Sequence, residues 1–174
     1  MNKVILLEQL KEFTELAIKD LLMPVRPQEN SPQEPPRPAR VHLINLPSGR
    51  GPTEQAPYVI HRIITGKDEQ PAGEREQAGA LVRTVFAVYN QDEQEGGLML
   101  LNLMERLRIG LLEDRLIGKQ FKLDMGSGLE SLVYPENVAP YYAGEMISVW
   151  RMPMIERKVP NAQEHTWNGG GIRR

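Results

Sequence analysis

Residues 81–89 read Leu-Val-Arg-Thr-Val-Phe-Ala-Val-Tyr, and this stretch decides the fold. It is rich in β-branched and aromatic residues, which favour a β-strand. Apolar residues stand at both odd and even positions, so both faces of the strand are apolar. Such a strand belongs in the middle of a sheet that is covered on both sides. Two helices of one small domain do not easily cover both faces, and a neighbouring subunit is one way to cover the second.

Four other segments have strand patterns. Val41–Leu46 is a short strand, and Tyr58–Thr65 is β-branched and apolar. Lys119–Met125 and Gly144–Met152 alternate apolar with polar residues, which is typical of half-buried strands. The connections between the predicted elements are polar or turn-rich loops at residues 47–57, 66–73, 90–97 and 126–140.

Two segments have helical periodicity, Asn2–Met23 and Leu98–Leu116. Asn2 is a suitable N-cap, and Pro24 ends the first helix. The predicted apolar stripes are Leu6, Leu10, Phe13, Ala17 and Leu21 in the first helix and Leu100, Leu103, Leu107 and Leu111 in the second. The predicted fold is therefore α+β: a single domain with a mixed or antiparallel β-sheet of four to five strands, packed with two main helices in the order α-β-β-β-α-β-β.

Two segments are expected to lie outside this core. Pro24–Arg40 contains six prolines and is predicted to be an extended or mobile arm that joins neither sheet nor helix. It is interpreted as a spacer, with a ligand for a proline-reading domain as the less favoured alternative. Asn161–Arg174 has only Trp167 to bury and is predicted to be a flexible tail whose deletion leaves the fold intact. The α+β domain is thus expected to span residues 1–160.

The composition excludes several classes of protein. The 174 residues carry a formal net charge of −2, so there is no basic field of the kind that holds nucleic acid. Cysteine is absent, which excludes disulfides, thiolate metal sites and a cysteine nucleophile. No apolar run approaches the length of a membrane span, and the charged N-terminal segment is not typical of a signal peptide. Synthesis in a reducing cytoplasm is expected.

Residues with catalytic potential do not form a recognisable set. His42, His61 and His165 are not at metal-ligand spacing, and His61 is interpreted as a structural histidine within its strand. The glycine-rich segment at residues 48–52 lacks the lysine and hydroxyl of a phosphate loop. The acidic cluster at residues 92–95 is either a cation or acid/base site or, the preferred interpretation, the start of a helix. No catalytic residue, metal site or cofactor is predicted.

Arginines in apolar strands are the unusual feature of the chain. Arg62 and Arg83 stand where a charge is costly unless it is paired. An internal partner and a salt bridge across a subunit interface explain them equally well. The arginines of the second helix, among them Arg106, more often form a solvated face than a nucleic-acid contact.

From Tyr58 onward, several motifs occur in a recognisable order. They are residues 57–62 (PYVIHR), 66–68 (GKD), 82–89 (VRTVFAVY), 97–108 (GLMLLNLMERLR), 121–123 (FKL) and 140–153 (PYYAGEMISVWRMP). With these motifs the sequence resembles the phage tail terminator, or tail completion, family and is similar in element order to the lambda-type terminator. The motifs are structural patterns, not catalytic signatures.

The resemblance implies a structural protein of a phage tail or phage-tail-like particle, made in the cytoplasm of the bacterial host. A hexameric ring of such subunits would cap the tail tube, end tube or sheath polymerisation and offer an attachment surface for the head or collar. The implied partners are further copies, the tube protein and either a sheath protein or a head connector, with DNA only passing through the lumen and no membrane. Candidate subunit contacts are Arg62, Arg83, Arg106 and Glu105, and candidate tube or partner contacts are Lys67, Asp68, Glu69 and Trp167.

Two alternatives stay open at the level of sequence. One is another ring of the same particle, such as a head-tail connector or a baseplate component. The other is a small cytoplasmic enzyme or ligand-binding module, which a deep pocket lined with polar groups would favour.

Overall fold

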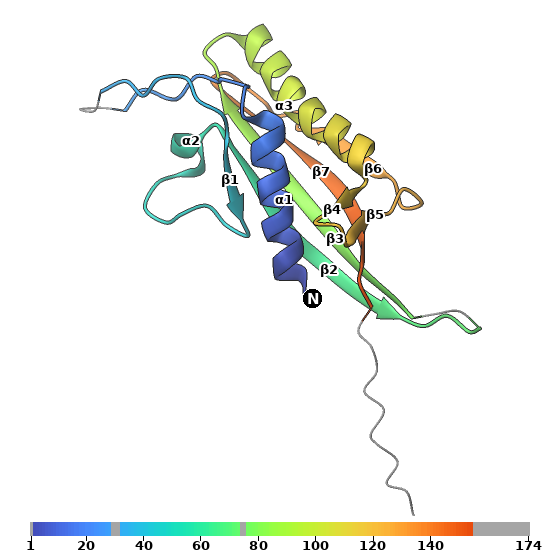
Figure 1. Cartoon of the computed structure of the whole chain (residues 1–174). Helices are drawn as coiled ribbons and strands as arrows, with labels where there is room; N and C mark the ends of the chain where they lie inside the picture. Colours follow the sequence, from blue (N-terminus) through green and yellow to red (C-terminus); the bar gives the residue numbers. More distant parts are fainter. Residues whose placement is uncertain (1, 29–31, 74–75, 155–174) are drawn as a thin grey trace, which may run out of the picture.

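Strand β3 (Gln77–Tyr89) lies in the middle of the sheet, as its sequence predicts. The computed structural model describes residues 2–28, 32–73 and 76–154. The strand order is β1-β2-β3-β7-β5-β4, and β6 also pairs with β7. Pairing is parallel only between β1 and β2, so the sheet is mixed. Both long helices, α1 and α3, lie on the near side of the sheet in Figure 1.

The predicted α+β class is confirmed, whereas the predicted number of strands is too low and a short third helix is added to the two main helices. Within the described ranges the structure has three helices and seven strands. They are α1 (Lys3–Ile18), β1 (Arg40–Leu43), α2 (Pro52–Gln55), β2 (Tyr58–Glu69), β3 (Gln77–Tyr89), α3 (Glu93–Asp114), β4 (Leu116–Ile117), β5 (Phe121–Leu123), β6 (Leu129–Val133) and β7 (Tyr141–Met152).

Helix α1 begins at the predicted N-cap. The Asn2 side chain accepts hydrogen bonds from the backbone N–H groups of Val4 and Ile5, both at 3.1 Å. These bonds satisfy two of the donors that the first turn of a helix leaves free. The helix ends at Ile18, earlier than the predicted Met23, and Met23 forms an isolated antiparallel bridge with Arg37.

Replacing this cap gives the first prediction. Asn2→Ala is expected to lower the free energy of unfolding by about 1 kcal/mol, because the N–H groups of the first turn lose their acceptor. Chemical denaturation measures the change. Asn102→Ala is the control, because Asn102 is an exposed residue inside α3 and Ala favours a helix. Equal losses in the two variants would contradict the role of the cap.

Helix α3 begins at Glu93, five residues before the predicted start, and it ends before Arg115. Asp92 is its N-cap and accepts from the backbone N–H groups of Gln94 and Glu95, both at 2.9 Å. The acidic cluster therefore forms the cap and first turn of the helix, which confirms the preferred interpretation. Arg115 takes a left-handed conformation and closes the helix, so that Leu116 begins strand β4.

The helices bury their apolar sides against one face of the sheet. Leu6 and Leu10 of α1 and all four predicted stripe residues of α3 lie in this core. Phe13, Ala17 and Leu21 are only half-buried, because Leu7, Thr14 and Ile18 take the central positions of α1. Phe86 of β3 and Trp150 of β7 come from the sheet and are fully buried.

The structure also differs from the prediction in two predicted turn segments and in the proline-rich arm. Strand β6 forms in the predicted turn-rich segment, because it pairs with β7 from Leu129 to Val133. Strand β2 continues through the predicted turn to Glu69 and forms a long hairpin with β3, which projects at the lower right of Figure 1. The proline-rich segment also differs: Val25 and Ala39 are buried, and Arg37 donates to the carbonyl oxygen of Pro57. Its described ends therefore pack on the domain.

Candidate functional site

The face of the sheet that points away from α1 and α3 is only partly covered. The segment before β2 covers one end, where Leu46 and Ala56 pack on Tyr58, Ile60, Ala87 and Tyr89. The half-exposed apolar side chains on this face are Val85, which packs on this cluster, and Leu81, Ile147 and Val149 beyond it. We call these four residues, together with Arg62 and Arg83, the open sheet face. The strand pattern predicts a sheet covered on both sides, and the described residues cover the second side at one end only.

Arg83 has internal partners on this face. Its Nε donates to Glu145 at 2.7 Å, a second ion-pair contact joins its Nη2 to the same carboxylate, and Nη2 also donates to the Tyr134 hydroxyl at 3.1 Å. Tyr134 donates to Glu145 at 2.6 Å. The bonds from Tyr134 and Arg83 hold the pKa of Glu145 below its usual value, although partial burial acts in the opposite direction. Arg83 therefore has an internal partner, and its candidacy as a subunit contact stays a prediction.

Arg62 is different, although it lies directly opposite Arg83 in the β2–β3 register. Its Nε is buried and has no hydrogen-bond partner among the described residues. No salt bridge to Arg62 occurs in this part of the chain. Like charges at opposed positions of two strands repel each other. Arg62 thus lacks the carboxylate that Arg83 has.

The two arginines are expected to respond differently to truncation. Arg83→Ala should lower the free energy of unfolding of the monomer by about 1 kcal/mol, because it deprives Glu145 and Tyr134 of their charged partner. Arg62→Ala should change it by less than about 0.5 kcal/mol. Chemical denaturation at a concentration where the chain is monomeric compares them, and a larger loss in Arg62→Ala would show an internal role for Arg62.

Glu105 and Arg106 lie on α3, away from the open sheet face. The carboxylate of Glu105 forms an ion pair with Arg108 at 2.7 Å, and this pair holds the pKa of Glu105 below its usual value. Arg106 contacts Asp20, just after α1, at 3.2 Å. Exposed pairs of this kind contribute little to stability, so either residue can exchange its partner at small cost.

Helix α3 also has a second apolar stripe, which is not among the predicted stripes. Leu98, Leu101 and Ile109 are 66%, 47% and 46% exposed. Half-buried Leu112 continues this outer stripe, and Glu105 lies at its centre. The spacing of three to four residues places these side chains on one side of the helix. The outer stripe is visible in the sequence once the inner leucines are assigned to the core.

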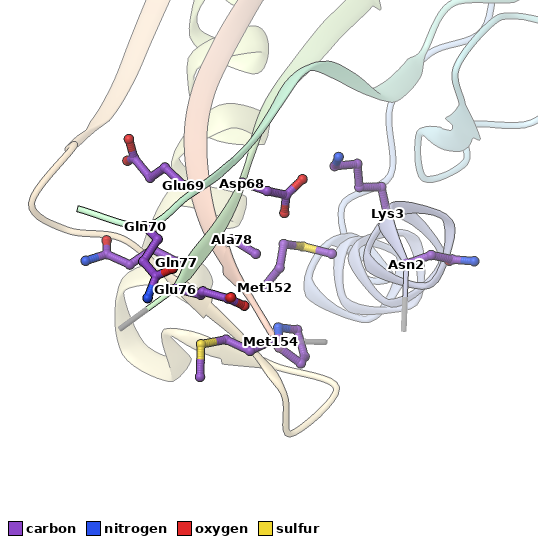
Figure 2. Close-up of a pocket in the computed structure, with 11 residues that line it drawn as sticks. Asn2, Lys3, Asp68, Glu69, Gln70, Glu76, Gln77, Ala78, Met152 and Met154 are labelled. Carbon is purple, nitrogen blue, oxygen red and sulfur yellow. The ribbon is translucent and has the colours of Figure 1, made fainter. Parts of the chain in front are cut away.

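The three predicted tube contacts at Lys67, Asp68 and Glu69 lie on the projecting hairpin, in β2 and not in a turn. Lys67 and Glu69 form an exposed ion pair at 2.5 Å. Figure 2 shows Asp68 and Glu69 at a hollow of about 510 Å³ between the hairpin, the start of α1 and the end of β7. Its lining is Asn2, Lys3, Asp68, Glu69, Gln70, Glu76, Gln77, Ala78, Met152, Pro153 and Met154. Trp167 lies outside the described residues.

The titratable residues in the described lining of the hollow are Lys3, Asp68, Glu69 and Glu76. None of its described lining residues is a histidine, serine or threonine, so neither an imidazole base nor a hydroxyl nucleophile is present in it. In residues 2–28, 32–73 and 76–154 no group of histidines and carboxylates could hold a metal ion. Within the same ranges, no helix is long and apolar enough to cross a membrane.

His61 is a structural residue, as predicted. It is fully buried, with Nε2 at 2.9 Å from the Thr14 hydroxyl of α1 and Nδ1 at 2.9 Å from the Thr84 hydroxyl of β3. Each ring nitrogen therefore has one partner, and the imidazole joins α1, β2 and β3. Burial lowers the pKa of His61 to about 3, so the ring is neutral at physiological pH.

No protein-family model matches this sequence, and no curated protein is significantly similar to it.

Proposed function

We propose that this chain is a structural subunit of a phage tail or phage-tail-like particle, and that copies of it form a ring that caps the tail tube. The single observation that carries the proposal is the open sheet face, which combines half-exposed apolar residues with Arg62, whose Nε has no partner in the described part of the chain. A surface of this composition is typical of an interface between proteins. The resemblance of the motifs from Tyr58 onward to tail terminators is the reason for proposing this particular assembly.

Two more features support an assembly role. The β2–β3 hairpin projects from the domain (Figure 1), and the exposed side chains of Lys67, Asp68 and Glu69 on β2 can contact a tube subunit. The outer stripe of α3 offers a second apolar surface on the other side of the molecule. A ring subunit needs at least two such surfaces, because each copy contacts a neighbour on either side.

The experiment combines the purified chain with polymerising tube protein from the same particle. Electron microscopy is expected to show rings at one end of the tubes and a limited tube length. A connector or baseplate component would instead bind without limiting tube length. A chain that stays monomeric and does not bind tube ends would overturn the proposal, whereas a ligand bound in the hollow by this monomer would favour the binding-module alternative.

A further inference from the structure

We infer that the outer stripe of α3 in one copy of this chain packs on the open sheet face of the next copy, with Glu105 of the first paired to Arg62 of the second. This inference rests on the proposed ring and specifies the contact that builds it. Its starting point is that Arg62 on one surface has no carboxylate partner among the described residues, while the other surface presents Glu105 among exposed apolar residues.

The two surfaces match in size. The outer stripe runs from Leu98 to Leu112, which is about 21 Å along a helix axis. The uncovered part of β3 runs from Gly79 to Val85, which is about 20 Å along a strand. A helix that lies on this part of the sheet would cover the apolar side chains that the chain's own helices leave half-exposed on the open sheet face.

The charges match as well. Arg62 needs a carboxylate, because its Nε is buried and has no partner among the described residues. Glu105 is free to supply one, since its present partner Arg108 lies three residues away on the exposed surface of the same helix. The apolar residues on either side of Glu105, Leu101 and Ile109, would then lie beside Arg62, where Leu81 is half-exposed.

The positions of the two surfaces on the subunit determine the symmetry of the contact between neighbouring copies. Helix α3 lies on one face of the sheet, and the open sheet face is the opposite one (Figure 1). A copy therefore cannot use the same surface as its neighbour, and the contact is head to tail. Head-to-tail contacts build rings when the rotation closes.

Exchange of the two charges tests the pairing. Arg62→Glu and Glu105→Lys are each expected to weaken self-association at least tenfold, and the double variant should recover most of this loss, as measured by light scattering and mass photometry. Arg106→Glu is the matched control, because Arg106 is exposed on the same helix but lies beside α1. Assembly that is unaffected by both single changes, or that the double variant does not recover, would overturn the pairing.

Disulfide cross-linking tests the contact without depending on ring closure, because the chain contains no cysteine. Leu81→Cys combined with Leu101→Cys or with Ile109→Cys is expected to give a ladder of cross-linked copies for one of the two pairs. Leu81→Cys with Val138→Cys, on an exposed loop, should give none. Rings that form while neither pair cross-links would overturn this contact and leave the ring itself standing, whereas a ladder without rings would support the contact and count against the cap.

Discussion

Lowering the pH from 7 to 4 is expected to reduce the free energy of unfolding by about 3 kcal/mol through His61 alone. The folded state holds the pKa of His61 at about 3, because the ring is buried between Thr14 and Thr84. In the unfolded chain the histidine has its ordinary pKa, so the unfolded state binds the proton first. The stability is therefore fully present above pH 6.5 and is lost progressively as the pH falls towards 3.

The window between pH 6.5 and pH 5 isolates this effect. The lowered pKa values of Glu145 and Asp124 act in the same direction, but only as the pH falls further, through the range of their own ionisation. Urea denaturation across the window should show a loss of about 1.5 kcal/mol in the wild type. His61→Gln should remove most of this slope, whatever its stability at pH 7.

His42 provides the matched control, because it is a histidine in the neighbouring strand β1. Its pKa is also lowered, first by burial and then by Lys11, but the ring is only half-buried. His42→Gln should therefore keep most of the pH dependence. If the His42 variant lost the slope and the His61 variant kept it, the assignment to His61 would be wrong.

Adding one methyl group to α3 should change the free energy of unfolding in opposite directions at two adjacent positions, Gly96 and Gly97. Gly96 is buried, and a Cβ there would lie 2.1 to 2.6 Å from three ring atoms of Tyr142. Tyr142 is 5% exposed, and its hydroxyl donates to the carbonyl oxygen of Asp92, the N-cap residue, at 3.3 Å. Gly96→Ala must displace this ring and is expected to cost about 2 kcal/mol.

Gly97 is the control for this change. A Cβ at Gly97 meets no atom within 4 Å, so Gly97→Ala should gain up to about 1 kcal/mol from the better helix propensity of alanine. The two variants should therefore differ by about 3 kcal/mol in chemical denaturation. Equal effects would mean that Tyr142 moves aside freely and does not fix the start of α3.

The sequence predicts the centre of this fold better than its boundaries. The apolar run of β3 and the inner leucines of α3 identify the core, because burial there follows directly from local periodicity. Helix α3 begins earlier than predicted because Asp92 acts as the cap. Gly96 and Gly97 disfavour a helix in the local sequence, and the packing of Tyr142 on Gly96 supports the helix there. Strand β6 has no such local pattern, since only its pairing with β7 makes it a strand.

For the candidate contact residues, too, the sequence predicts one part and the tertiary structure decides the other. The cost of burying a charge identifies both Arg62 and Arg83, but their partners depend on residues distant in sequence. Glu145 lies on β7 beside Arg83, and no carboxylate reaches Arg62 within the described part of the chain. Periodicity cannot predict this difference between the two arginines. The difference arises because β7, which carries Glu145, pairs with β3.

In the ring that we propose, Arg62 would also act before assembly. Two copies that approached each other through identical open sheet faces would bring their Arg62 side chains together, and no described carboxylate pairs with this residue, whereas Arg83 is paired with Glu145. Repulsion between the two Arg62 charges would disfavour this face-to-face contact, while a surface that carries a carboxylate would still be accepted. Arg62 would thus help to keep subunits of the proposed ring apart until a correctly oriented neighbour binds.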